Sequence, residues 1–291
     1  MKRRKELLAW IYLMPAILIL AVFMFYPMIR SLSLSVSNFN FIGSPSFNGM
    51  ENYQELIEDK NFLAALWNTA RLSVVVIIAN IILPILLAVL VNRQFKFINF
   101  FRASYYVPVI TSMVVVGIIW QGLYAEYGII NYILLELGLI KESFNWLTNP
   151  NTALMAVGMV IIWRGLGYYM VIYLAGLQNI PESLYEAARI DGANRFKQFI
   201  SVTVPMLMPS IVVVAVMTTI NALKIFDEIY IMTQGGPIGS TETLVYFIYN
   251  QAFDKLNVGY ASAAGVILFA ISLLFSVMHI FLSRKSEEHI G

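Results

Sequence analysis

The sequence predicts an all-α integral membrane protein that crosses the bilayer six times, and three observations support this fold class. Of the 291 residues, 59% are hydrophobic and 12% are charged, and the mean hydropathy is +0.73. Soluble domains carry about 25% charged residues, so this chain lacks the polar residues that a soluble surface needs. The apolar residues also form separate long segments, and lysine and arginine gather in every second connection between them.

Each long apolar segment can cross the hydrocarbon layer as a helix, which needs about 20 residues. The first follows Met-Lys-Arg-Arg-Lys, as in a signal peptide, but it is much longer than a signal core of ~7–15 residues, so we expect a retained signal anchor. Prolines within spans are tolerated, because neighbouring helices can satisfy the freed carbonyl groups. The six predicted spans are residues 7–29, 72–91, 105–123, 152–177, 204–223 and 261–282.

Basic residues predict the orientation of these spans. By the positive-inside rule, we expect both termini, the second-to-third connection and the fourth-to-fifth connection of this multi-pass protein to face the cytoplasm. We expect residues 1–65 to hold the anchor span and an external segment, and residues 66–286 to form the transmembrane core. The basic residues that set this orientation are Lys2, Arg3, Arg4, Lys5, Arg93, Lys96, Arg102, Arg189, Arg195, Lys197, Arg284 and Lys285.

The composition argues against catalysis in this chain. There is no cysteine, which excludes disulfides, thiol chemistry and cysteine-ligated metals. No glycine-rich phosphate loop is present, and His279 and His289 are the only histidines and belong to no zinc motif. A net charge of +2 is too small to indicate a nucleic-acid partner. We therefore predict no enzyme activity, no metal site and no nucleic-acid binding.

One charged stretch interrupts the apolar sequence on the cytoplasmic side: EAARIDGANRFKQFISVTVP, residues 186–205. Pro181 suits the first position of a helix, and Ser183 and Glu186 have the spacing of a capping box. The sequence therefore predicts a short helix over residues 181–190, outside the membrane.

The same stretch predicts a bend and a second helix. Gly192 can end the first helix, because glycine accepts a left-handed backbone conformation. Asp191 can then cap a second short helix over residues 194–200. Ala187 and Ala188 give the first helix a small, flat face that another protein could approach closely. An ordinary solvated connector between two spans is the alternative.

This stretch is similar to the EAA loop of permeases in binding-protein-dependent ABC importers: E-A-A, three residues, G, nine residues, I-x-L-P. Here Glu186–Ala188 is followed at that spacing by Gly192 and then by Val202, Val204 and Pro205. The segment FDEIYIMTQGGPIGSTETLVYFIYNQAF and the opening span resemble sugar-type permeases, those of the maltose-transporter first-permease and glycerol-phosphate-permease kind. The long N-terminal extension and large external insert of the enterobacterial maltose permease are absent.

The resemblance implies a type I ABC-importer permease fold whose cytoplasmic loop, residues 178–205, carries a coupling helix that docks on an ATP-hydrolysing subunit. It implies import of a sugar or oligosaccharide together with a second permease, two ATPase subunits that bind ATP and Mg²⁺, and an extracellular solute-binding protein. Glycerol phosphate or another polar solute, or a secondary transporter, are the alternatives. The expected coupling residues are Tyr185, Glu186, Ala187, Ala188, Asp191, Gly192 and Pro205.

Polar residues within the fourth and fifth spans are the candidates for the solute pathway. A charge at mid-bilayer costs at least ~2.5–3.5 kcal/mol, so Arg164 should face a wet pocket, or pair with Asp227, Glu228 or a partner subunit to hold helices together. Thr218 and Asn221 share a helix face and could bind solute or join helices by hydrogen bonds. By resemblance, the sugar pocket of maltose-type permeases matches Gly165, Tyr168, Thr218 and Asn221. The predicted substrate pathway is Trp163, Arg164, Gly165, Tyr168, Thr218 and Asn221.

Overall fold

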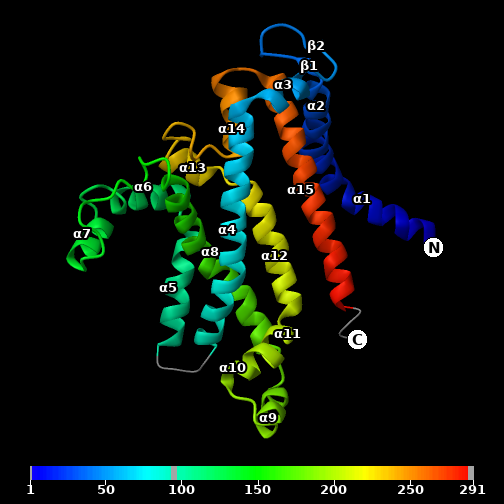
Figure 1. Cartoon of the computed structure of the whole chain (residues 1–291). Coiled ribbons are helices and arrows are strands. Elements are labelled where there is room, and N and C mark those ends of the chain that lie inside the picture. Colours follow the sequence, from blue (N-terminus) through cyan, green and yellow to red (C-terminus); the bar gives the residue numbers. More distant parts are fainter. Residues whose placement is uncertain (1, 93–96, 288–291) are drawn as a thin grey trace. The chain divides into compact units, whose positions relative to one another are not determined.

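A computed structural model describes residues 2–92 and 97–287, and helices dominate these ranges (Figure 1). The connection that carries Arg93 and Lys96 lies outside the described residues. The elements are, in order, α1 (Lys2–Leu20), η1 (Ala21–Phe25), α2 (Tyr26–Ser35), β1 (Ser37–Asn38), β2 (Ser46–Phe47), α3 (Glu51–Glu58), α4 (Lys60–Val91), α5 (Ile98–Ile110), α6 (Met113–Leu123), α7 (Ile129–Glu136), α8 (Ala153–Gln178), α9 (Glu182–Ile190), α10 (Arg195–Gln198), η2 (Phe199–Thr203), α11 (Val204–Met206), α12 (Met208–Leu223), α13 (Asp227–Met232), α14 (Leu244–Tyr249), η3 (Asn250–Asp254) and α15 (Val258–Glu287), where η marks a π-helical turn.

The chain forms two compact units. The first holds the residues up to Leu63 together with Phe247–Ala270, and the second holds Ala64–Tyr246 together with the residues from Ile271 onward. In the first unit, β1 and β2 form a small antiparallel pair. The buried Asn52 amide on α3 donates to the backbone carbonyl of Ser35 at 2.9 Å, which ties α3 to the end of α2.

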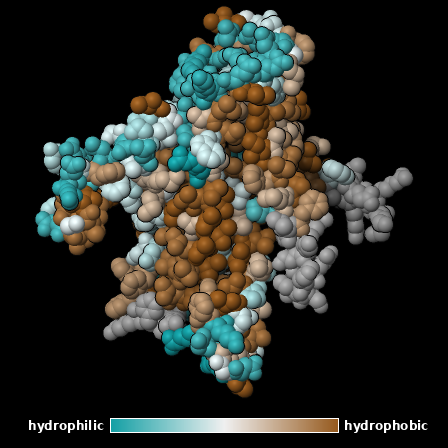
Figure 2. Space-filling view, in the orientation of Figure 1, coloured by the Kyte–Doolittle hydropathy of each residue, from teal (hydrophilic) through white to brown (hydrophobic). Residues whose placement is uncertain are grey.

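The prediction of an all-helical, multi-span fold is confirmed. Within the described residues, four helices are long and apolar enough to cross a membrane, and two bent helix pairs raise the number to six if each pair counts as one span. Figure 2 shows hydrophobic side chains over α4 and hydrophilic ones around α9 and α10. The four helices are Trp10–Ser35, Lys60–Val91, Ala153–Gln178 and Val258–His279, and the pairs are Phe100–Ile110 with Met113–Leu123 and Arg195–Met206 with Met208–Leu223.

The third predicted span is not one straight helix, because α5 and α6 meet at an angle of 102°. The backbone is extended at Thr111 and Ser112, with ψ of 138° and 136°. Pro108 lacks the N–H group that a continuous helix would use, and the Thr111 hydroxyl donates to the Val107 carbonyl at 2.8 Å. The Val107 carbonyl also accepts from the Thr111 N–H at 3.2 Å, so both groups of Thr111 bond to the last turn of α5 before the chain turns away.

The fifth predicted span bends by 69° at Leu207, between α11 and α12. Pro205 and Pro209 flank this residue and donate no backbone hydrogen bond, which favours a kink here. Two backbone bonds still cross the bend, from the Leu207 N–H to Thr203 and from the Ile211 N–H to Leu207, each at 2.9 Å. The chain from α10 to α12 thus remains a continuous, bent helical run.

Helix α8 is the central element of the second unit. Its buried side chains belong to two hydrophobic clusters, one around Val157 and Val160 and the other around Met170 and Tyr173. At Gly167 the helix approaches α5 so closely that a β-carbon would overlap the carbonyl oxygen of Tyr105. Small residues permit such close backbone contact between membrane helices, where packing rather than the hydrophobic effect holds the helices together.

Candidate functional site

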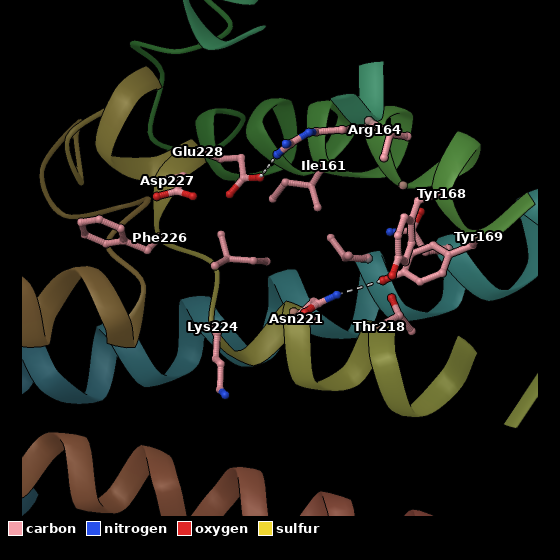
Figure 3. Close-up of a pocket in the computed structure, with 16 residues that line it drawn as sticks. Ile161, Arg164, Tyr168, Tyr169, Thr218, Asn221, Lys224, Phe226, Asp227 and Glu228 are labelled. Atoms are coloured by element: carbon pink, nitrogen blue, oxygen red, sulfur yellow. Dashed lines mark hydrogen bonds and ion pairs between the residues drawn. The ribbon is translucent and has the colours of Figure 1, made fainter. Parts of the chain in front are cut away.

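A cavity of about 290 Å³ lies within the second unit and is lined by α4, α5, α8, α12 and the segment that leads into α13 (Figure 3). Five of the six predicted pathway residues line it: Arg164, Gly165, Tyr168, Thr218 and Asn221. The exception is Trp163, whose ring packs edge-to-face against Trp120 with the centroids 5.4 Å apart.

Aromatic and amide groups meet at one end of the cavity. The Asn221 amide nitrogen donates to the Tyr169 hydroxyl at 3.3 Å. Tyr169 is buried and packs edge-to-face against Tyr168, with the ring centroids 5.2 Å apart. Figure 3 shows Tyr168, Tyr169, Thr218 and Asn221 grouped together. This end of the cavity can therefore offer a ring surface beside hydroxyl and amide groups.

Charged groups lie at the other end of the cavity. The Arg164 guanidinium is 3.8 Å from the Glu228 carboxylate and 3.5 Å from the Met113 sulfur. Burial raises the pKa of the Glu228 carboxyl, whereas a hydrogen bond from its own backbone and the charge of Arg164 act in the opposite direction. Arg164 thus lines the cavity and also pairs with Glu228, so the two alternatives for this residue are not exclusive. The Lys224 side chain points away from this pair (Figure 3).

Sequence reasoning missed Asn80 on α4, which lines the same cavity and is only 2% exposed. Its amide packs against Gly165, where a β-carbon would stand 2.5 Å from the amide oxygen and 2.7 Å from the amide nitrogen. Asn80 could have been identified from the sequence, since it is a single amide within the apolar run SVVVIIANIILP. Polar residues inside membrane spans usually have a partner or a function.

The charged stretch around residues 186–205 contains the predicted first short helix, α9, but its start differs from the prediction. Pro181 is the N-cap residue and no side chain caps the helix. The predicted capping box is wrong, because Ser183 is already the second residue within the helix. An exposed ion pair between Arg189 and Glu182 at 2.7 Å links the two ends of α9 instead.

As predicted, a left-handed glycine terminates α9: Gly192 has φ of +75°. The Gly192 N–H bonds to the Arg189 carbonyl at 3.0 Å and the Ala193 N–H bonds to the Ala188 carbonyl at 2.9 Å. These two bonds form a Schellman motif, which closes a helix through a left-handed residue.

The predicted N-cap of the second short helix is wrong, because Asn194 rather than Asp191 fills this role. The Asn194 side-chain oxygen accepts from the Lys197 N–H at 2.9 Å, and Asp191 is the C-cap of α9. The helix α10 is also shorter than expected and continues as the π-helical turn η2. The Tyr185 hydroxyl lies 3.0 Å from the Thr203 hydroxyl, which connects α9 to η2.

Most side chains of α9 and α10 are exposed to solvent. None of the nine residues of α9 is buried, and Glu186 and Ala187 are exposed. Two large apolar side chains also face outward, Ile190 at 87% exposure and Phe196 at 71%. Both side chains and the charged residues around them are therefore accessible to a partner protein.

The fold and the cavity together define a class: a multi-pass, helical membrane transport protein. Residues 69–287 match the family of binding-protein-dependent transport system inner membrane components, and the chain belongs to this family. It is accordingly a permease subunit of an ATP-driven ABC importer that works with a solute-binding protein, and it is not itself the catalytic subunit.

Relatives and solved structures agree with this membership. The lactose transport system permease protein of Rhizobium radiobacter is 35% identical and covers 99% of this chain and 97% of its own length. The sulfoquinovosyl glycerol transport system permease protein of Agrobacterium fabrum is 36% identical, with 97% and 92% covered. A permease in the crystal structure of a bacterial importer of the polysaccharide alginate superposes with a TM-score of 0.84 at 25% identity, covering 97% of this chain and 96% of that one.

Proposed function

We propose that this permease imports a sugar or oligosaccharide, and that the cavity between α4, α8 and α12 is the place where the solute crosses. The supporting observation is the composition of its wall: the Tyr168 ring lies beside the hydroxyl of Thr218 and the amide of Asn221. Sugars present apolar ring faces and hydroxyl groups, and this wall matches both. The relatives named for lactose and sulfoquinovosyl glycerol transport support the same class of solute.

The cavity offers weaker support for an anionic solute such as glycerol phosphate. Two basic residues line the cavity, Arg164 and Lys224, but Arg164 already pairs with Glu228 and the Lys224 side chain points away from this pair (Figure 3). Asp227 also lines the cavity. A phosphate group would therefore compete with a neighbouring carboxylate for Arg164 and would meet a second negative charge.

In the proposed complex, this chain pairs with a second permease, two ATPase subunits bind ATP and Mg²⁺, and an external receptor delivers the solute. Closure of the ATPases moves α9, the coupling helix, with Glu186, Ala187 and Ala188 at the contact. Figure 1 shows α9 and α10 at the end of α8 and α12 that is far from α13. The helical run from α10 through α12 leads directly from this end to Thr218 and Asn221, so movement of the coupling helix can change access to the cavity.

The proposed topology places both termini and α9 in the cytoplasm of a bacterium, and residues 1–65 as an anchor span with an external segment. The sequence has no cysteine, so single-cysteine variants need no further changes. We expect Ile42→Cys, at an 80% exposed site, to react with an impermeant thiol reagent added to intact cells. Lys197→Cys on α10 should react only after the membrane is permeabilised. The reverse pattern would contradict the orientation.

The solute assignment predicts the behaviour of two cavity variants. Tyr168→Ala removes the ring surface and Asn221→Ala removes the amide, so each is expected to lower uptake of a receptor-delivered sugar about tenfold or more. The measurement is uptake of radiolabelled lactose and raffinose by proteoliposomes that hold the complete importer, with ATP inside. Tyr132→Ala on α7, at a 62% exposed tyrosine outside the cavity, is the matched control and should transport normally. Normal uptake by both cavity variants would overturn the assignment of the site.

A further inference from the structure

A second pocket, of about 450 Å³, lies within the second unit, between the ends of two spans and the helices α9, α10 and η2. Its apolar wall comes from Val89 in the last turn of α4, Leu177 in the last turn of α8 and Phe199 at the start of η2. It shares no lining residue with the cavity around Arg164. Its volume is in the range of about 300–1,000 Å³ that is typical of small-molecule sites.

Positive charge predominates in this pocket. Two guanidinium groups line it from different helices, Arg189 on α9 and Arg195 on α10, together with the carboxylate of Glu182. Arg189 pairs with Glu182 at 2.7 Å, but both side chains are exposed, so water weakens this pair. Arg195 has no acidic partner within residues 2–92 and 97–287. The pocket therefore carries a net positive charge and can attract an anion.

Hydroxyl and amide groups complete the wall. The Tyr185 and Thr203 hydroxyls lie 3.0 Å apart, and each can form a further hydrogen bond. The Gln198 amide nitrogen donates to the Ala193 carbonyl at 2.8 Å, so the Gln198 side-chain oxygen can still accept. Asn92, directly after α4, adds a second amide. These groups can bond the hydroxyls of an organic anion beside its charge.

We propose that this pocket binds a phosphate ester, either the headgroup of an anionic phospholipid or a soluble ester in the cytoplasm. Arginine suits phosphate, because its planar guanidinium directs two N–H groups at two oxygens. Basic pockets between transmembrane helices at the cytoplasmic side also suit the headgroups of anionic lipids. The pocket is separate from the proposed solute cavity, so the proposal goes beyond the proposed function and takes from it only the cytoplasmic location of α9.

A bound ester would restrain the coupling helix. Glu182, Tyr185 and Arg189 recur at spacings of three and four residues, so one face of α9 lines the pocket. Ala187 and Ile190 lie outside this face and stay exposed for the ATPase. Because the wall also includes the ends of α4 and α8, the ester would contact the spans and α9 together. A ligand stabilises the arrangement that it binds best, so the ester should hold α9 in place.

Three variants test the role of charge in this pocket. Arg195→Gln is expected to weaken binding about tenfold, because a charge-assisted hydrogen bond is lost. Lys197→Gln is the matched control, since it removes the same charge from the same helix but lies outside the pocket wall, and it should bind normally. Glu182→Gln should strengthen binding about threefold, because it releases Arg189 and removes the negative charge.

The measurements use the complete importer in lipid nanodiscs, with two arms that distinguish the sources of the ester. In phosphatidylcholine nanodiscs, calorimetric titration with glucose 6-phosphate tests a soluble ester, and glucose is the uncharged comparison. A higher Tm in nanodiscs that contain phosphatidylglycerol than in phosphatidylcholine alone tests a lipid headgroup. In the arm that shows binding, amide hydrogen exchange over Glu182–Ile190 should slow.

An effect that Arg195→Gln removes and Lys197→Gln retains supports the site, and the arm in which it occurs identifies the source. No effect in either arm, or an equal effect in Arg195→Gln and the native importer, would overturn the site. Loss of the ATPase on co-purification with Arg195→Gln would contradict it as well, because Arg195 would then contact that subunit. Sugar uptake is not part of this test, so its failure leaves the proposed function standing.

Discussion

Replacing Gly192 by valine is expected to abolish ATP-driven uptake while the permease still inserts in the membrane. Residue 192 has φ of +75°, and a β-branched side chain there costs about 1–3 kcal/mol in backbone strain. No atom lies within 4 Å of the position of an added β-carbon, so the effect comes from the backbone and not from a clash. Relief of the strain breaks the Schellman motif and redirects α9 relative to α10. The coupling helix then no longer fits the ATPase.

The measurements are co-purification of the ATPase with the permease and solute-stimulated ATP hydrolysis in proteoliposomes. The chain offers a matched control in Gly138, which follows α7, has φ of +67° and has free space around it. Its neighbours form the same pair of bonds, from Gly138 to Leu135 and from Leu139 to Leu134, each at 2.9 Å. Gly138→Val therefore carries the same strain away from α9 and should retain ATPase binding.

A bulky side chain on the face of α9 provides an independent test of docking. Ala188→Trp should block contact with the ATPase by its volume while leaving the backbone of α9 unchanged. If Gly192→Val and Ala188→Trp both retain the ATPase and transport at the normal rate, the segment is an ordinary connector and the coupling proposal fails.

Gly167→Ala is expected to destabilise the second unit strongly. A β-carbon at this position would overlap the backbone carbonyl of Tyr105 on α5, and backbone cannot move aside as a flexible side chain can. Overpacking commonly costs about 1–3 kcal/mol, and a clash with backbone belongs at the upper end of this range or above it. We expect a low yield of the folded complex and a Tm lowered by several degrees.

Gly122→Ala is the control for this substitution, since Gly122 on α6 has no atom within 4 Å of an added β-carbon. It should leave the yield unchanged and the Tm equal or slightly higher, because alanine favours a helix over glycine. Equal stability of Gly167→Ala and the native protein would mean that α5 and α8 are further apart than the structure places them.

Composition predicted the helical spans well, because a run of about 20 apolar residues has few alternatives to a membrane helix. It did not predict the two breaks, because proline alone does not decide where a helix ends. Pro15 and Pro84 lie inside the continuous helices α1 and α4. The break after Pro108 falls at Thr111 and Ser112, whose ψ angles of 138° and 136° leave the helical region, and hydropathy does not record such backbone angles.

The candidate site, too, could be predicted from the sequence only in part. Thr218 and Asn221 could be placed on one helix face from their spacing, and both line the cavity. Asn80 could not be assigned to it, because its proximity to Gly165 depends on how α4 packs against α8, which no local pattern records. At the second short helix, Asp191 and Asn194 are both good capping residues. The Schellman motif at Gly192 decided between them by assigning Asp191 to the preceding helix.

The bent helical run from α10 to α12 has a thermodynamic consequence. It carries both Phe196, on the surface proposed to contact the ATPase, and Thr218 and Asn221, on the wall of the cavity proposed for the solute, so one helical run connects the two proposed sites. If occupation of one site alters affinity at the other by some factor, the reverse effect has the same factor, because linkage between two binding equilibria is reciprocal. The linkage can therefore be measured at equilibrium, without ATP turnover. It is the ratio between the affinity of the ATPase for the solute-loaded permease and its affinity for the solute-free permease.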